Sequence, residues 1–427
     1  MSYNMHLRDL IFINNKRSIP SEEGIDHSLK LLKEGYQFIL NRRYTMDANI
    51  FETKLLGETA ICLTGSEMAE LFYDTDKFKR EGAAPKPVQK TLFGEGGVQS
   101  LDGEAHHHRK AMFMRVMKPD DLQTIRRLFA KHWQKDARAW EQQDEIQLYE
   151  KVKTVLFKAA CEWTGVPLEE NPEDRADQIS EMFETPAHIG IRHLKGWKAR
   201  SDAEKWMASY VEEVRNGERS DAAGTPLEAF SLHRDHHGEL LDAETAAVEL
   251  LNLIRPITAI SVYVAFAALA LHEYPEEAAK LQSEEARERF VQEVRRYYPF
   301  FPFTAARVKQ DFTMGEHTFK EGTLALLDLY GTNHHPDEWE NPGRFQPSRF
   351  EGWQGTPFQF IPQGGGEFDF GHRCAGEWMT VELLKESVLQ LQEHLSYDLP
   401  EQNLSFSLTT IPTIPESGIV LKNVQPV

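Results

Sequence analysis

Cysteine is scarce in this chain. Its 427 residues include only Cys62, Cys161 and Cys374, which lie far apart and form no CxxC pair. This spacing excludes a disulfide framework and argues against a zinc site built from cysteines. Free cysteines are typical of a reducing compartment, so we expect a cytoplasmic protein.

Positive charge and long apolar runs are also lacking. Lys and Arg number 48 against 67 Asp and Glu, which gives a formal net charge of −19. Such acidity makes nucleic acid and anionic membranes poor partners. No stretch reaches the roughly 18 uninterrupted apolar residues of a membrane helix, so no membrane span is expected. Residues 1–15 show no signal-peptide pattern.

The apolar periodicity predicts a mainly α-helical protein with a minor β region. The longest helix should run from Ala243 to about Glu273 and be buried, because its second half is apolar nearly all round. Ser66 should cap a helix that ends near Tyr73. No repeat or linker divides the chain, so residues 1–427 are predicted to form one domain. Further helices are expected in 22–40, 105–165, 284–298 and 377–394, and strands in 49–64, 303–327 and 406–421.

A glycine-rich loop, residues 361–376, contains Cys374. A predicted helix follows at once, and the free N–H groups at a helix N-terminus stabilise a thiolate. Glycines at 364–366 let the backbone come close to a bulky group. A thiolate beside such a loop suits haem iron, and the alternative is a buried, inert cysteine.

Two further motifs precede this loop. Glu293 and Arg296 can pair on one face of a predicted helix, and Arg349 follows in Pro-Ser-Arg-Phe. The ordered set Glu-x-x-Arg, Pro-x-Arg-Phe and Cys-x-Gly resembles the cytochrome P-450 superfamily. This resemblance implies a P-450 fold enclosing haem b, Cys374 as the axial iron ligand, and a structural cluster of the other three residues. The loop departs from the usual pattern, because its glycines stand earlier.

The longest helix carries an unusual pair, Arg255 and Pro256. An oxygen-activating P-450 would have an acid followed by threonine near this point, to relay protons. Arginine stays charged, and proline has no hydroxyl and bends a helix. No acidic residue lies one turn away from Arg255. Its partner is therefore either an acid from another helix or a carboxylate of the substrate.

Together with the glycine loop, the Arg-Pro pair resembles the bacterial fatty-acid peroxygenase family. The resemblance implies a long-chain fatty acid as substrate, hydrogen peroxide as oxidant and no dedicated redox partner. The fatty-acid carboxylate, held by Arg255, would act as the acid–base group. Arg255, Pro256 and Gln99 are then the catalytic residues.

Gln99 bears on the product. By the resemblance, its position holds His in decarboxylating relatives and Gln in those that mainly hydroxylate. His can move protons near neutral pH, whereas Gln only forms hydrogen bonds. We therefore expect hydroxylation at Cα or Cβ, with decarboxylation to terminal alkenes as the alternative.

The same resemblance assigns the remaining site residues. Arg80 and His106 would bind the haem propionates. The neighbouring histidines 106–108 point in different directions on a helix, which argues against a metal site there. An apolar tunnel for the acyl chain would be lined by Leu92, Phe93, Ala259, Phe300 and Phe303.

Three rival functions stay open. The first is a reductase-dependent monooxygenase of the same fold, against which the missing acid–threonine pair counts. The second is a haem-binding sensor or carrier without turnover. The third is a hydrolase that uses Cys374 as nucleophile and His372 as base, although residues two apart would hardly face each other.

Overall fold

The computed structural model describes residues 19–187 and 190–427, so the segment considered for a signal peptide lies outside the described residues. Helices dominate, as predicted. They are α1 (Ser28–Glu34), α2 (Phe38–Met46), α3 (Ser66–Phe72), α4 (Lys86–Val88), α5 (Gly103–Met114), α6 (Pro119–Trp140), α7 (Leu148–Thr164), α8 (Pro172–Glu184), α9 (Ile191–Arg215), α10 (Pro226–Ser231), α11 (Ala243–Glu273), α12 (Pro275–Ala278), α13 (Glu284–Tyr297), α14 (Leu329–Asn333) and α15 (Glu377–Glu393). Short helical turns are η2 (Gly35–Gln37), η3 (Gln89–Phe93), η4 (Val98–Ser100), η5 (Ser220–Ala222) and η6 (Pro347–Phe350).

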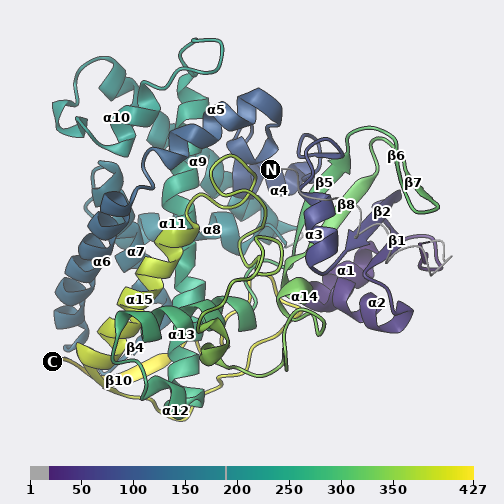
Figure 1. Ribbon diagram of the computed structural model, residues 1–427. Coiled ribbons are helices and arrows are strands. Elements are labelled where there is room, and N and C mark those ends of the chain that lie inside the picture. Colours follow the sequence, from purple (N-terminus) through teal and green to yellow (C-terminus); the bar gives the residue numbers. More distant parts are fainter. Residues whose placement is uncertain (1–18, 188–189) are drawn as a thin grey trace.

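The main sheet has five strands in the order β1-β2-β8-β5-β3, and it lies beside the helical part with α1, α2 and α3 close to it (Figure 1). β2 and β8 are parallel, and the other neighbours are antiparallel. Smaller sheets have the orders β4-β10-β9 and β6-β7. The strands are β1 (Ile50–Leu55), β2 (Glu58–Leu63), β3 (Phe78–Lys79), β4 (Glu145–Gln147), β5 (Phe303–Val308), β6 (Phe312–Met314), β7 (His317–Phe319), β8 (Leu324–Asp328), β9 (Leu395–Asp398) and β10 (Val420–Pro426).

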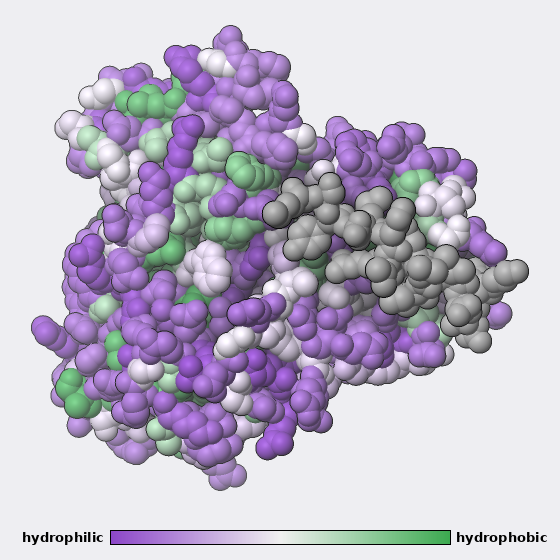
Figure 2. Space-filling view, viewed as in Figure 1, coloured by the Kyte–Doolittle hydropathy of each residue, from purple (hydrophilic) through white to green (hydrophobic). Residues whose placement is uncertain are grey.

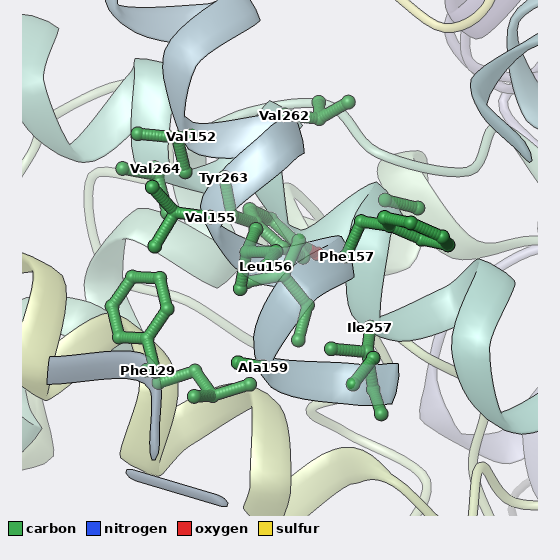
Figure 3. Packing of buried hydrophobic residues seen from close by; sticks show 14 of the residues in the cluster. Phe129, Val152, Val155, Leu156, Phe157, Ala159, Ile257, Val262, Tyr263 and Val264 are labelled. Atoms are coloured by element: carbon green, nitrogen blue, oxygen red, sulfur yellow. The ribbon is translucent and has the colours of Figure 1, made fainter. Parts of the chain in front are cut away.

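Helix α11 runs through the centre of the helical part, where it packs against α7, α9 and α15 (Figure 1). Figure 3 shows side chains of α7 and α11, among them Leu156 and Tyr263, packed together in the core. α11 is long and apolar enough to cross a membrane, yet 94% of its most apolar window is buried inside the protein. It is therefore a core helix. Hydrophilic residues prevail on the face in Figure 2, with apolar residues in patches.

Two sequence predictions are wrong in detail. Gly65, and not Ser66, precedes α3, and the Ser66 hydroxyl hydrogen-bonds Glu338 instead. In the predicted strand 406–421 only the end, from Val420, is a strand. Two prolines, at 412 and 415, remove ladder donors from this segment, and the Phe406 ring packs on Phe266 of α11.

Candidate active site

Tyr73 accounts for the glycines of the loop 361–376. A Cβ atom on Gly364, Gly365 or Gly366 would lie within 3.3 Å of the Tyr73 side chain. Gly364 and Gly366 also have positive φ angles, 90° and 84°, which favour glycine. The close packing of Tyr73, the positive φ angles at 364 and 366, and the Pro357 carbonyl 2.7 Å from a Cβ at 365 together favour the shifted glycines.

Cys374 lies just before α15 and is half-buried. Its Sγ accepts a hydrogen bond from the Gly376 N–H and lies 4.0 Å from Gln363 Nε2. Burial raises the pKa of the thiol, and the Lys110 ammonium acts in the opposite direction. Lys110 also donates to the Arg373 carbonyl, which ties α5 to the loop. Two amide groups and a cation close to the sulfur suit a thiolate ligand.

Glu377, the first residue of α15, is a buried carboxylate that fixes the same loop. It accepts hydrogen bonds from Arg295 Nη2 at 2.6 Å and Arg373 Nε at 2.5 Å. Arg295 also donates to Gln363 Oε1 at 3.0 Å. Although burial acts in the opposite direction, the two arginines lower the pKa of Glu377. Sequence reasoning missed Arg295; its place beside Arg296, at the apolar end of α13, was the only signal.

The structure brings Glu293, Arg296 and Arg349 into contact. Arg296 Nε and Nη2 lie 2.7 and 2.8 Å from the Glu293 oxygens, and Arg349 Nε lies 3.1 Å from Glu293 Oε1. Glu293 and Arg296 are fully buried. Arg296 Nη1 also donates to the Asn333 carbonyl at 3.0 Å. The cluster therefore joins α13, η6 and the end of α14.

Arg80 and His106 lie near His372, a histidine of the loop that contains Cys374. The His106 ring stacks on His372, with ring centroids 3.8 Å apart, and His372 Nε2 lies 3.7 Å from Asp102 Oδ1. Burial lowers the pKa of His106 to about 3, so it is neutral at pH 7. The buried Arg80 guanidinium lies over the Phe72 ring and forms no ion pair within the described parts of the chain. A buried, unpaired cation near Cys374's loop fits the propionates of a haem.

Arg255 lies on α11 with 5% of its surface exposed. Its one hydrogen bond among the described residues runs from Nη2 to Asn252 Oδ1 at 3.4 Å, and its Nε has no partner there. No carboxylate in residues 19–187 or 190–427 pairs with it. Burial, and then the nearby Arg200, lower the pKa of Arg255 to about 9, so it stays protonated at neutral pH. Of the two partners that the sequence allowed, an acid from another helix is absent from the described chain.

Pro256 lies inside α11, and the helix runs through it without interruption. A proline has no N–H, so the Asn252 carbonyl, four residues earlier, lacks its usual helical donor. A carbonyl without a helical donor therefore lies one turn from Arg255. The predicted pair thus places a charge and a backbone carbonyl without its helical donor on the same part of α11.

Asn252 is a site residue that the sequence analysis missed. Its Nδ2 donates to Gln99 Oε1 at 3.3 Å and to Glu249 Oε2 at 3.1 Å, while its Oδ1 accepts from Arg255. Glu249 is fully buried and pairs with Arg109 Nη1 at 2.7 Å. One amide therefore joins the two predicted catalytic side chains, Gln99 and Arg255.

The predicted tunnel residues divide into two groups. Leu92, Phe93, Ala259 and Phe300 belong to the large apolar cluster around α11. Phe303, at the start of β5, packs instead with a cluster of the main sheet. Four of the five residues thus belong to one core cluster and Phe303 to another, and the tunnel-lining role of all five stays a prediction.

A family model described as Cytochrome P450 matches residues 28–385. The chain belongs to the cytochrome P450 family. Membership confirms the predicted fold and cofactor, so the protein is a haem-thiolate oxidoreductase that holds haem b. The fit of Cys374, Arg80 and His106 to a haem agrees with this assignment.

Solved structures of cytochromes P450 are similar over nearly the whole chain. Cytochrome P450EX alpha (CYP152N1) with myristic acid is 49% identical, with a TM-score of 0.94, over 96% of this chain and 100% of that one. Cytochrome P450SP alpha (CYP152B1) in complex with (R)-ibuprophen is 42% identical, with a TM-score of 0.92, over 94% and 99%. A variant of cytochrome P450 OleT in complex with arachidonic acid is 37% identical, with a TM-score of 0.93, over 96% and 99%.

Curated relatives are more distant. Taxane 13-alpha-hydroxylase of Taxus cuspidata is 22% identical over 90% of this chain and 86% of its own length. Putative cytochrome P450 138 of Mycobacterium tuberculosis is 22% identical over 71% and 74%. The solved structures are therefore more similar to this chain than the curated relatives are. They confirm the predicted resemblance to the fatty-acid peroxygenases within the cytochrome P450 family.

Proposed function

We propose that this protein uses hydrogen peroxide to hydroxylate long-chain fatty acids at Cα or Cβ, in the cytoplasm and without a redox partner. Two of the similar solved structures hold fatty acids, myristic acid and arachidonic acid. The balanced reaction converts R–CH2–COOH and H2O2 into R–CH(OH)–COOH and H2O, or the corresponding 3-hydroxy acid. The oxidant is consumed in the reaction itself, so no reductase is needed.

The observation that carries the proposal is the unpaired cation on α11. A buried charge that has lost its partner destabilises a protein by about 3–5 kcal/mol. Arg255 has no anionic partner in the described chain, and its Nε has no hydrogen-bond acceptor there. A fatty-acid carboxylate would supply both, in a bidentate pair that also orients the acyl chain.

The chain's own residues divide the remaining work. Haem b, when bound, supplies the oxidising power that transfers oxygen from peroxide to a C–H bond. Cys374 would bind its iron through the thiolate, and Arg80 and His106 would hold its propionates. Arg255 keeps the substrate carboxylate in place, where a carboxylate oxygen takes a proton from the peroxide and returns it to the leaving oxygen.

Gln99 favours hydroxylation over decarboxylation in this scheme. Its amide accepts a hydrogen bond from Asn252 and cannot be protonated near pH 7. Without a proton carrier at this position, transfer of a hydroxyl group to the substrate carbon is the favoured outcome.

The test is incubation of haem-loaded protein with palmitic acid and hydrogen peroxide, followed by mass-spectrometric identification of the products. We expect 2- and 3-hydroxypalmitic acid. Arg255→Ala should lower kcat/KM at least about a hundredfold while haem content stays unchanged, because the carboxylate loses its anchor. Arg219→Ala, at an exposed ion pair with Asp221, is the matched control and should keep full activity.

The two haem-binding rivals predict different outcomes. A carrier without turnover gives no product, and a reductase-dependent enzyme gives product with electron donors and dioxygen but not with peroxide. Full activity of Arg255→Ala would show that the substrate carboxylate is not held as proposed.

A further inference from the structure

A buried arginine on α9 holds the backbone of Leu92 and Phe93, the two residues that we call the wall of the predicted tunnel. Arg200 is 1% exposed, and its Nη1 and Nη2 lie 3.4 and 3.3 Å from the carbonyl oxygens of Leu92 and Phe93. These residues end the turn η3, where carbonyl groups lack helical donors. One guanidinium therefore ties the end of η3 to α9.

The fit around this contact is close. Gly94, which follows Leu92 and Phe93, has a φ of +81°. A Cβ atom on Gly94 would lie 2.1 Å from Arg200 Nη2 and 2.6 Å from Val248 Cγ1. The backbone at position 94 is thus enclosed between α9 and α11. The wall cannot approach either helix further, and the guanidinium prevents it from moving away.

The charge of Arg200 is balanced on its outer side. Its Nε donates to Glu204 Oε1 at 2.5 Å, and Glu204 is 31% exposed. Both residues line a cavity of about 340 Å³ that also includes Lys90, Trp197 and Thr245. The carboxylate therefore lies toward solvent, while the guanidinium points inward to the tunnel wall.

We infer that Arg200 is a positioning residue which holds Leu92 and Phe93 against the first carbons of the acyl chain and so restricts oxidation to Cα and Cβ. The inference rests on the proposed function. Arg255 on α11 fixes the carboxylate end of the substrate, and the wall fixed by Arg200 limits which carbons reach the oxidant. A looser wall would admit carbons further along the chain.

The test compares Arg200→Met with Arg215→Met in the haem-loaded enzyme. Arg215 lies on the same helix and donates to the carbonyls of Ser231 and Leu241, at 2.9 and 2.7 Å, away from the site. It is thus a matched helix-to-loop contact. Two readouts are the amide hydrogen exchange of residues 89–94 and the positions of hydroxyl groups in the products.

We expect Arg200→Met to exchange these amides about tenfold faster and to yield products hydroxylated beyond Cβ, with a larger change in kcat than in KM. Arg215→Met should change neither readout. Arg200→Lys, which keeps the cation but reaches one carbonyl at most, should give an intermediate result, and it serves as the test if the methionine variant does not fold.

Wild-type exchange and product positions in Arg200→Met would overturn the inference, and so would faster exchange without a change in product positions. Failure of the proposed function is recognised separately, because the wild-type enzyme would then form no hydroxy acid. In that case the exchange measurement still decides whether Arg200 holds the wall.

Discussion

At the scale of residues, Gln99 and Arg255 meet through the side chain of Asn252. The Asn252 amide donates to Gln99 and accepts from Arg255, so its orientation couples the two. Both contacts are long, 3.3 and 3.4 Å, which leaves the guanidinium free to turn toward a carboxylate. Because the described residues supply no anion for Arg255, we propose that the anion comes from the substrate.

The first prediction concerns Gln99. In Gln99→His the imidazole can move a proton near neutral pH, so the terminal alkene should rise severalfold relative to hydroxy acid. Gas chromatography of products from one fatty acid measures the ratio. Gln99→Leu removes the amide without adding a proton carrier and should not raise the alkene fraction. An equal rise in both variants would mean that proton transfer at this position does not set the product.

The second prediction concerns the buried pair behind Asn252. Glu249→Gln leaves the Arg109 guanidinium without its counter-charge and should lower the free energy of unfolding by about 3–5 kcal/mol. Asp221→Asn, at the exposed pair with Arg219, should change it far less, because water screens an exposed pair. Urea unfolding of the haem-loaded proteins measures both. Equal losses would contradict a stabilising role for the buried pair.

At this scale the sequence predicted the features that depend on neighbouring residues, and it missed contacts between residues far apart in the chain. The absence of an acid one turn from Arg255 follows from helical spacing alone, so this prediction needed no structure. The contact of Asn252 with Gln99 spans 153 residues of chain, and that of Arg200 with Phe93 spans 107. Such contacts depend on tertiary packing, which no local pattern contains.

At the scale of elements, α11 was predicted with both ends correct. Its N-cap Asp242 accepts the Thr245 N–H at 2.6 Å, and a proline follows shortly after Glu273. Both signals are local. The predicted strand 406–421 was wrong because a strand needs a neighbour, and alternation along one segment does not reveal whether a neighbour exists.

The third prediction concerns the contact between the α1–α2 layer and β1. Burial alone would raise the pKa of Glu22, which lies at this contact. Hydrogen bonds from Arg42, Thr53 and Lys30 outweigh burial and lower this pKa from 4.5 to about 2. A carboxyl group whose pKa is lowered on folding stabilises the fold at pH values above its ordinary pKa. This stabilisation is lost as the pH falls through 4.5 toward 2.

Glu22→Gln should therefore flatten the pH dependence of the free energy of unfolding in this range, with stability near that of the wild type at the acid end. Urea unfolding at several pH values is the measurement. Its exposed neighbour offers the control Glu23→Gln, which should keep the wild-type slope. A wild-type slope in Glu22→Gln would show that other carboxylates carry the acid sensitivity.

At the scale of the whole molecule, the site combines distant parts of the chain. The loop with Cys374, α5 with His106 and Lys110, the turns η3 and η4, and α11 each contribute. The formal net charge is −19, yet the residues around the site include the buried cations Arg80, Arg200 and Arg255. We therefore expect local positive charge, and not net charge, to determine whether a carboxylate is attracted.

We propose that Arg255 holds the substrate carboxylate, which acts as the acid–base group for peroxide. The most direct measurement compares initial rates of peroxide-driven hydroxylation for palmitic acid and methyl palmitate, which share the acyl chain. We expect the acid to react at least about a hundredfold faster, because the ester offers Arg255 no anion and cannot take a proton. Comparable rates for acid and ester would contradict it.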